Sequence, residues 1–277
     1  MILQNKNAVV YGAGGSLGGA IARALAAAGA RVLATGRNME SVQQTAAEIK
    51  NAGGKCEPAI VDALDQAAVE KHIADVVSGY GSVDISFNAI GYNVVQNMPL
   101  VSMDVEDFIS PAATGLRTQF ITTTAAAKIM MRQHSGVILA LTATPGGIGY
   151  PLTAGFAVLC SGLERYTYNL AAELGPYNIR VINMRSGGSP DSKVFTEAAR
   201  LYPEEMKEVF AKMEQDTMLK RLPLMADIAN AAVFLSSDFA ASITGTTIDI
   251  TAGTTAGLNY RMKAEEISPR EKYTIVK

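Results

Sequence analysis

Four glycines between residues 12 and 18 have the spacing that a phosphate-binding turn requires. The segment Gly12-Ala-Gly-Gly-Ser-Leu-Gly18 follows a short predicted strand, 7–11, and precedes an alanine-rich predicted helix, 20–28. Glycine tolerates the positive φ of a sharp turn, and the first amides of a helix carry unpaired N–H groups at the positive end of its dipole. The segment therefore indicates a dinucleotide whose pyrophosphate lies over the turn, although a tight turn alone also favours glycine.

The glycines of this turn have separate expected roles. Gly12 allows the sharp turn, and the other three keep side chains away from the pyrophosphate. In the helix that follows, a small face is expected to lie close to a sheet, formed by Ala20, Ala24, Ala27 and Ala28. The expected cofactor contacts of the turn are Gly12, Gly14, Gly15, Ser16, Leu17 and Gly18.

The residue after the second predicted strand, 31–36, bears on which dinucleotide would bind. An acidic residue there would hold a ribose 2′-hydroxyl and repel a 2′-phosphate. This chain has Gly36-Arg37-Asn38 at that point, and the donor fork of arginine suits a phosphate. Arg37 therefore predicts NADP(H) rather than NAD, the alternative being a solvated residue at a strand end.

Two more polar residues lie at the ends of predicted strands. Asp62 ends strand 56–62 and could accept a hydrogen bond from the adenine amino group, or cap the helix that follows. Asn88 lies near the end of strand 83–89, at the carboxyl edge where open α/β sheets bind ligands. A structural amide that ties neighbouring strands together is the alternative for Asn88, and the two roles are compatible.

Strands that alternate with helices of about 10 to 15 residues are typical of a parallel, doubly wound α/β sheet. Three more strands are predicted at 136–144, 178–184 and 246–250. The remaining predicted helices are 41–51, 67–78, 104–133, 156–174, 191–218 and 226–236. Pro111 would mark either the start of the 104–133 helix or a kink in it.

Composition restricts the class of protein. The chain has 277 residues, of which 48% are hydrophobic, and this suits one large α/β domain. A net charge of −2, the lack of a basic block and the lack of an apolar run of about 18 residues predict no nucleic-acid or membrane partner. Two cysteines without a pairing pattern indicate a reducing compartment such as the cytoplasm. No metal site is predicted, and His72 and His134 are expected to be solvated.

Landmarks along residues 5–253 resemble those of the short-chain dehydrogenase/reductase family in order and spacing. Beside the glycine turn and Asp62, they are Asn88-Ala-Ile-Gly91, Leu170-Ala-Ala-Glu-Leu-Gly-Pro176, Ile179-Arg-Val181, Ser186-Gly187, Phe234-Leu-Ser-Ser-Asp238 and Ile243-Thr-Gly245. The resemblance implies a single Rossmann domain over residues 1–253, with a seven-stranded sheet and helices on both faces. Within it, residues 188–222 would form a helical segment over the substrate, and residues 254–277 would form a tail.

The resemblance also implies partners and further contacts. It implies a nicotinamide cofactor, a small-molecule substrate and a homodimer or homotetramer, with helices near 112–133 and 156–174 at the subunit interface. The cofactor contacts that it adds to those above are Ala63, Ala89, Gly91, Ser186 and Gly187. Ser16 stands where the family usually has a glycine, so Gly15 is expected to supply the flexibility instead.

The positions that carry catalysis in this family do not match. The family's cooperating Asn, Ser, Tyr and Lys fall on Gly115, Ala143, Phe156 and Cys160. The chain has no lysine between Lys128 and Lys193, so the tyrosine–lysine pair cannot be shifted along the helix. Phenylalanine cannot transfer a proton, and a neutral cysteine cannot replace an ammonium group that lowers the pKa of a neighbour.

Other residues could substitute for the missing groups. Thr142 and Thr144 could hydrogen-bond a substrate oxygen, and Tyr150 or Tyr92 could present a phenol, while the thiol of Cys160 could be reactive. For each of them, a structural role is the simpler interpretation.

The leading hypothesis is therefore an NADP(H)-binding oxidoreductase with an atypical active site, acting on a small or medium organic carbonyl or an activated alkene. One alternative is a catalytically silent NADP(H)-binding sensor or structural protein, and another is a non-redox enzyme that reuses the pocket. A closed, packed pair of Phe156 and Cys160 would favour the silent protein. An open pocket that Tyr150 or Thr144 enters would favour the enzyme.

Overall fold

Seven parallel strands form one sheet in the order β3-β2-β1-β4-β5-β6-β7. The computed structural model of the protein describes residues 1–256. The strands are β1 (Asn7–Tyr11), β2 (Arg31–Gly36), β3 (Lys55–Ile60), β4 (Ile85–Asn88), β5 (Gly136–Ala143), β6 (Ile179–Ser186) and β7 (Thr246–Ile250). The order changes direction between β1 and β4, and ligands of such sheets bind outside the carboxyl ends of the strands at that point. The predicted doubly wound sheet of seven strands is confirmed.

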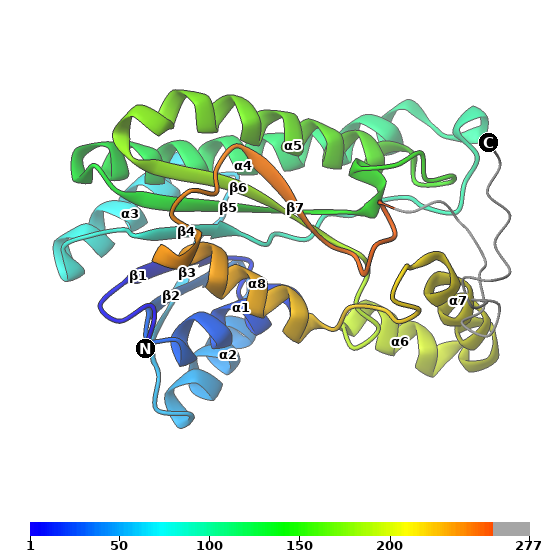
Figure 1. The fold of residues 1–277 in the computed structure, drawn as a ribbon, viewed down its shortest axis with the longest axis horizontal. Coiled ribbons are helices and arrows are strands. Elements are labelled where there is room, and N and C mark those ends of the chain that lie inside the picture. The colour runs from blue at the N-terminus through cyan, green and yellow to red at the C-terminus, as the bar shows by residue number, and fades with distance from the viewer. Residues whose placement is uncertain (257–277) are drawn as a thin grey trace, which may run out of the picture.

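Helices cover both faces of the sheet (Figure 1). One face is covered by α1 (Ser16–Ala27), α2 (Met39–Asn51) and α8 (Met225–Ser236). The other is covered by α3 (Gln66–Tyr80), α4 (Val105–Gln133) and α5 (Ala154–Leu174). Two more helices, α6 (Lys193–Leu201) and α7 (Pro203–Asp216), lie to the side of these layers, on the right in Figure 1.

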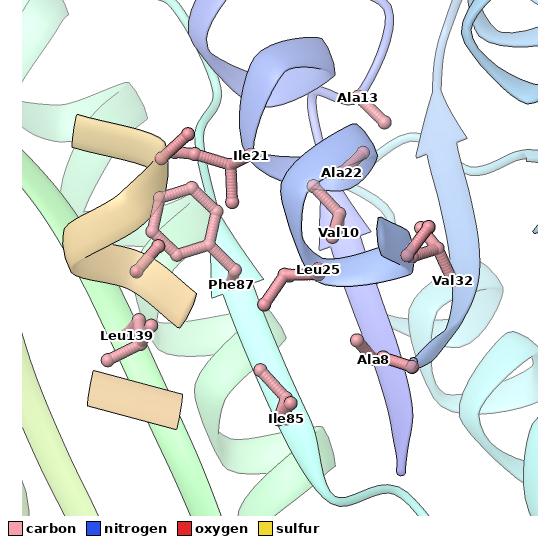
Figure 2. Close-up of a cluster of buried hydrophobic side chains, with 14 of the residues drawn as sticks. Ala8, Val10, Ala13, Ile21, Ala22, Leu25, Val32, Ile85, Phe87 and Leu139 are labelled. Carbon is pink, nitrogen blue, oxygen red and sulfur yellow. The ribbon is translucent and has the colours of Figure 1, made fainter. Parts of the chain in front are cut away.

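Each central strand contributes to two cores because its side chains alternate between the faces. In β1, Ala8 and Val10 belong to the core under α1, whereas Val9 and Tyr11 belong to the core under α3 and α4. A strand that is buried on both faces must be apolar nearly throughout, which explains why residues 7–11 carry no charge. Figure 2 shows the first of these cores, with the Phe87 side chain among residues of α1 and β5.

The buried face of α1 differs from the predicted one. The helix begins at Ser16, and it buries Gly18, Gly19, Ile21, Ala22, Leu25 and Ala26. The predicted face is confirmed only in part: Ala20, Ala24 and Ala28 are partly buried and pack against the core, whereas Ala27 is exposed. The glycine turn determines where the chain enters the helix, and therefore which side of the helix meets the sheet.

Two other helical predictions need correction. Pro111 lies inside α4, which begins at Val105, so it does not mark the start of the helix. The predicted excursion at 191–218 consists of two helices, because Pro203 begins α7 directly after Tyr202. Residues 257–277 of the predicted tail lie outside the described residues. Among the helices within residues 1–256, none has both the length and the apolar character needed to span a membrane.

Replacing Phe87 with alanine should lower the free energy of unfolding by about 3–5 kcal/mol, because it leaves a cavity between α1 and the sheet. Urea unfolding followed by circular dichroism measures the change. The matched control is Phe239→Ala, whose side chain is 75% exposed and whose loss should change the value by less than about 0.5 kcal/mol. Equal effects of the two substitutions would contradict the assignment of Phe87 to the core.

Candidate cofactor and active site

The glycine turn packs against the end of β4 and against itself. Gly12 has a φ of +77°, and a Cβ on it would lie 2.6 Å from the carbonyl oxygen of Ala89. A Cβ on Gly18 would collide with the carbonyl oxygen of Gly12. These two glycines therefore allow the strand, the turn and the first turn of α1 to approach one another closely.

The other two glycines of the turn serve different purposes. A side chain on Gly14 would collide with the hydroxyl of Ser41 at the start of α2, so Gly14 makes room for protein rather than for a ligand. Gly15 is exposed and caps α1 with an ordinary extended φ of −87°, so the flexibility expected of it is not used. The open surface of the turn thus lies at Gly15 and at the first amides of α1.

The first turn of α1 also contacts the segment that contains α6. The Ser16 hydroxyl accepts a hydrogen bond of 3.0 Å from the backbone N–H of Lys193, the first residue of α6. The Leu17 side chain packs against the core, which leaves only its backbone toward the turn. The structure therefore brings together the glycine turn and the segment at 188–222.

Arg37 lies at the carboxyl end of β2, next to the start of α2. The residue is exposed, and its side chain forms no ion pair with other residues of the described chain. Its neighbour Asn38 accepts a hydrogen bond of 3.0 Å from the Ser41 N–H and so caps α2. The Arg37 guanidinium is free to meet a ligand at this edge.

Asp62 lies after β3 and does not cap the next helix. Its carboxylate accepts a hydrogen bond of 3.0 Å from the Leu64 N–H, and Asp65 is the residue that caps α3. The capping alternative for Asp62 was therefore wrong, because α3 begins at Gln66 and Asp65 is the residue directly before it. Ala63 is buried beside it in the core under α3.

Asn88 has a structural role, although its side chain binds a helix and the chain after β4 rather than a neighbouring strand. It is 4% exposed, donates to the Thr122 hydroxyl at 3.1 Å and accepts from the Ile90 N–H at 3.1 Å. The side chain therefore ties β4 to α4 and shapes the chain that follows the strand. Gly91, two residues after Ala89, is exposed and has open space around it.

The asparagine and serine positions of the family hold small residues. A side chain on Gly115 would collide with Leu159, so this glycine allows α4 and α5 to approach closely. Ala143 ends β5 and provides no hydroxyl. An asparagine at position 115 could not be accommodated without moving Leu159.

The tyrosine and lysine positions are filled by apolar packing. Phe156 is half-buried against a cluster that also contains Tyr92, Ala112, Leu159 and Leu163. Cys160 is 1% exposed, and burial raises the pKa of its thiol to about 12. A thiol that stays protonated near neutral pH is a poor nucleophile and cannot act as a cation.

The substitute groups are mostly engaged with protein. The Thr142 hydroxyl donates to Glu164 at 3.0 Å, and the Thr144 hydroxyl donates to the Ser186 carbonyl at 3.3 Å. Tyr150 is exposed in the loop before α5. Burial raises the pKa of Tyr92, and a hydrogen bond with Thr118 offsets only part of that effect. Tyr92 is therefore a weak acid that packs between α4 and α5.

A buried ion pair lies under α5, and sequence reasoning missed it. The Arg185 guanidinium donates to both carboxylate oxygens of Glu164, at 3.0 and 2.6 Å, and to Asp249 at 2.7 Å. The side chains of Arg185 and Glu164 are 11% and 10% exposed. Burial alone would lower the pKa of Arg185, but the two carboxylates together raise it above its usual value.

This ion pair also requires glycine in the loop after β5. A side chain on Gly146 would collide with Glu164, and one on Gly147 would lie 2.6 Å from the Arg185 guanidinium. The predicted strand ended at residue 184, whereas β6 continues to Ser186 and therefore includes Arg185. A buried arginine needs a carboxylate partner. Placing Arg185 inside the buried strand would therefore have prompted a search for that partner, which is Glu164.

The two histidines differ. His134 is exposed at the end of α4, as expected. His72 is half-buried, its Nδ1 has no hydrogen-bond partner within residues 1–256, and burial lowers its pKa. The expectation that His72 is solvated was therefore wrong. Within the described chain, no three His, Cys, Asp or Glu side chains are grouped as metal ligands.

Taken together, the carboxyl edge of the sheet fits a dinucleotide. The turn offers the amides of a helix N-terminus, two of its glycines hold the backbone close to β4, and Arg37 provides an unpaired cation beyond β2. The nearby end of α5 offers packed apolar groups rather than a proton donor. The site can therefore hold a phosphorylated nucleotide.

Comparisons with known proteins agree with this geometry. A family model described as "Enoyl-(Acyl carrier protein) reductase" matches residues 12–255. An uncharacterised oxidoreductase of Mycobacterium tuberculosis is 31% identical over 255 residues, which cover 91% of this chain and 93% of that protein. Levodione reductase of Leifsonia aquatica is 30% identical over 251 residues, which cover 90% and 93% of the two chains.

Solved structures show the same fold. The crystal structure of sorbitol-6-phosphate 2-dehydrogenase from Erwinia amylovora aligns with a TM-score of 0.82 and 28% identity, covering 89% of this chain and 98% of that one. The matches extend over nearly the whole chain and include the sheet, the glycine turn and β7. The protein therefore belongs to the short-chain dehydrogenase/reductase family, whose oxidoreductases bind NAD or NADP.

Proposed function

We propose that this oxidoreductase uses NADP(H) and transfers hydride at a site that lacks the family's serine, tyrosine and lysine. The observation that carries the choice of cofactor is the unpaired Arg37 beyond β2. The cofactor, when bound, supplies or accepts the hydride. The backbone amides of Gly15 and of the first turn of α1 would hold its pyrophosphate, and Arg37 would hold its 2′-phosphate.

The charge around the adenosine end favours a 2′-phosphate. Arg37 has no carboxylate partner in the described part of the chain, and the next residue, Asn38, is neutral and committed to capping α2. A carboxylate at this position would accept from a free 2′-hydroxyl, and the chain has none there. A planar guanidinium offers paired donors that match phosphate oxygens.

Phe156 supplies no acid at the family's tyrosine position, and burial makes the nearby Tyr92 a weaker acid than usual, which favours an activated alkene over a simple ketone as substrate. Hydride addition to an isolated carbonyl leaves an alkoxide, which needs a proton from a positioned acid. Hydride addition to the β-carbon of an alkene conjugated with a carbonyl moves the π electrons onto the carbonyl oxygen and leaves an enolate. Its charge is shared between oxygen and the α-carbon, so water can protonate that carbon without help from Phe156 or Cys160.

The segment at 188–222 is proposed to cover the substrate. It forms α6 and α7, whose Phe195 and Phe210 rings lie 5.7 Å apart, and it meets the glycine turn through Lys193 and Ser16. A cover attached at the cofactor edge would exclude water from the reacting atoms. The cytoplasm is the proposed compartment, because Cys56 and Cys160 are both buried and unpaired.

A homodimer or homotetramer is proposed from an apolar stripe on α4. The exposed side chains Val105, Ile109, Leu116 and Phe120 recur at helical spacing along this helix. Val158 on the neighbouring α5 is also exposed. Family members often form oligomers, and a second copy of the same two helices would cover this stripe.

The alternative is a catalytically silent protein that binds NADP(H). The packing of Phe156 with Tyr92 and Leu159 favours it, because this cluster occupies the space next to the family's tyrosine and lysine positions. Both the enzyme and the silent protein would bind NADP(H), but only the enzyme would turn over a substrate. The experiments below therefore measure binding and turnover separately.

Arg37→Ala should weaken NADPH binding by about 10- to 100-fold, because it removes a charge-assisted contact worth about 1.5–3 kcal/mol. NADH binding should change by less than about two-fold, since NADH has no 2′-phosphate. Titration followed by nicotinamide fluorescence measures both affinities. The control is Arg132→Ala, an exposed arginine at the end of α4. An equal loss for both cofactors would overturn the 2′-phosphate assignment.

The double variant Phe156→Tyr/Cys160→Lys should raise ketone reduction by about 10²–10⁴-fold, because it restores a proton donor and the cation that lowers its pKa. The wild type should reduce a conjugated enone faster than the matching saturated ketone, measured by loss of NADPH absorbance. Cys160→Lys alone is the control, since it adds the cation without the acid. Tight NADPH binding by the wild type with no turnover of either substrate would instead identify the silent protein.

Phe120→Glu should shift the protein to a smaller species in light scattering. Burial of one phenylalanine side chain contributes about 1.5–3 kcal/mol to the free energy of association. A dimer loses this contribution from both subunits, so its dissociation constant should rise by about 100-fold or more. The control is Leu201→Glu, an exposed leucine on α6 outside the stripe. An unchanged mass for Phe120→Glu would exclude this face as the interface.

A further inference from the structure

A basic hollow opens at the amino end of the sheet, away from the glycine turn. It has a volume of about 350 Å³ and is lined by Asn5, Lys6, Asn7, Gly29, Arg31, Lys55, Gly79 and Tyr80. This lining contains three cationic side chains and no carboxylate. Arg31 begins β2, whereas Arg37 follows the end of the same strand, so the two sites are separated by about 20 Å of extended chain.

Two of the cations face each other across neighbouring strands. Arg31 of β2 and Lys55 of β3 are register partners, so their side chains lie on the same face of the sheet. Like charges placed directly opposite are destabilising. Neither side chain forms an ion pair with any residue that the structure describes.

The Arg31 guanidinium is oriented by an aromatic ring. Its central carbon lies 4.3 Å from the centre of the Tyr80 ring at the end of α3. Stacking uses the face of the guanidinium and leaves its N–H groups available at the edge. Those donors meet no acceptor among residues 1–256, although a planar donor fork is suited to phosphate oxygens.

The nearest carboxylates are engaged elsewhere. Asp84 lies 3.8 Å from Lys6 and also accepts from the Asn7 N–H and the Ser82 hydroxyl, both at 2.8 Å. Glu57, two residues after Lys55 on β3, pairs with Lys50 at 3.6 Å. The positive charge of Arg31 and Lys55 is therefore not balanced within the hollow.

We propose that the basic hollow binds a small phosphate-bearing anion, with Arg31 and Lys55 as its charged ligands. Its oxygens would separate the two cations and accept the free donors of Arg31. The volume suits a compact anion with one or two phosphate groups. This site is separate from the cofactor edge, so the proposal does not depend on the choice of NADP(H).

Calorimetric titration with pyrophosphate tests the proposal at constant ionic strength, with and without saturating NADP+. The wild type should bind pyrophosphate saturably in both conditions. Lys55→Glu should weaken binding by at least ten-fold, because the new carboxylate would pair with Arg31 and repel the anion. Lys207→Glu makes the same charge change on α7, on the right in Figure 1, and should change the affinity for pyrophosphate by less than two-fold.

Thermal unfolding provides a second readout. Without added anion, Lys55→Glu should raise the midpoint, because it replaces a like-charge pair with an attractive one, and Lys55→Gln should raise it less. Pyrophosphate should raise the midpoint of the wild type more than that of either variant, again in the presence of NADP+. The higher midpoint of the variants without anion and the larger pyrophosphate effect on the wild type are both expected only if Arg31 and Lys55 repel each other in the free protein.

Several results would overturn the proposal. Pyrophosphate binding that NADP+ abolishes would belong to the glycine turn, and equal binding by the wild type and Lys55→Glu would exclude the hollow. Linear, non-saturating heats would indicate ionic screening alone. Tighter binding of citrate than of pyrophosphate at the same ionic strength would replace phosphate by carboxylate as the ligand chemistry.

Discussion

The Arg185 guanidinium pairs with both oxygens of Glu164 in the layer between α5 and the sheet, and much of the active-site edge depends on this contact. Removing one partner of a buried ion pair costs about 3–5 kcal/mol, because the other charge is left in a poorly solvated place. The pair connects β6 to α5, and Asp249 extends it to β7. It also requires Gly146 and Gly147 in the loop above, so it positions the loop that leads to Phe156.

The same region explains how α4 and α5 are held together. Gly115 lets Leu159 enter the contact between α4 and α5, and Phe156 packs with Tyr92 beside it. These contacts are apolar and close, so they hold the two helices against each other. The cofactor edge is built from other elements, namely the glycine turn and the ends of β2 and β4. The glycine turn and the contact between α4 and α5 therefore belong to different parts of the fold.

Sequence reasoning worked best where one local property decides the structure. The strands β1, β2 and β7 have the predicted limits. For β1 and β2, a buried run bounded by turns leaves little choice. It worked less well where two elements meet. The orientation of α1 and the burial of His72 depend on neighbours distant in sequence. Arg185 was missed because the strand was predicted to end at residue 184, two residues before the end of β6.

By itself, the sequence determined the doubly wound sheet, the glycine turn after β1 and the residue types at positions 37, 156 and 160. These features are local in sequence, since they depend on periodicity, on residue type and on counting along one helix. Only the tertiary structure decided that Gly14 makes room for Ser41, that Asn88 is committed to Thr122, and that Arg31 faces Lys55 without a carboxylate. Burial and electrostatic energy depend on which side chains become neighbours in space, and the packing of the helices against the sheet sets those neighbours.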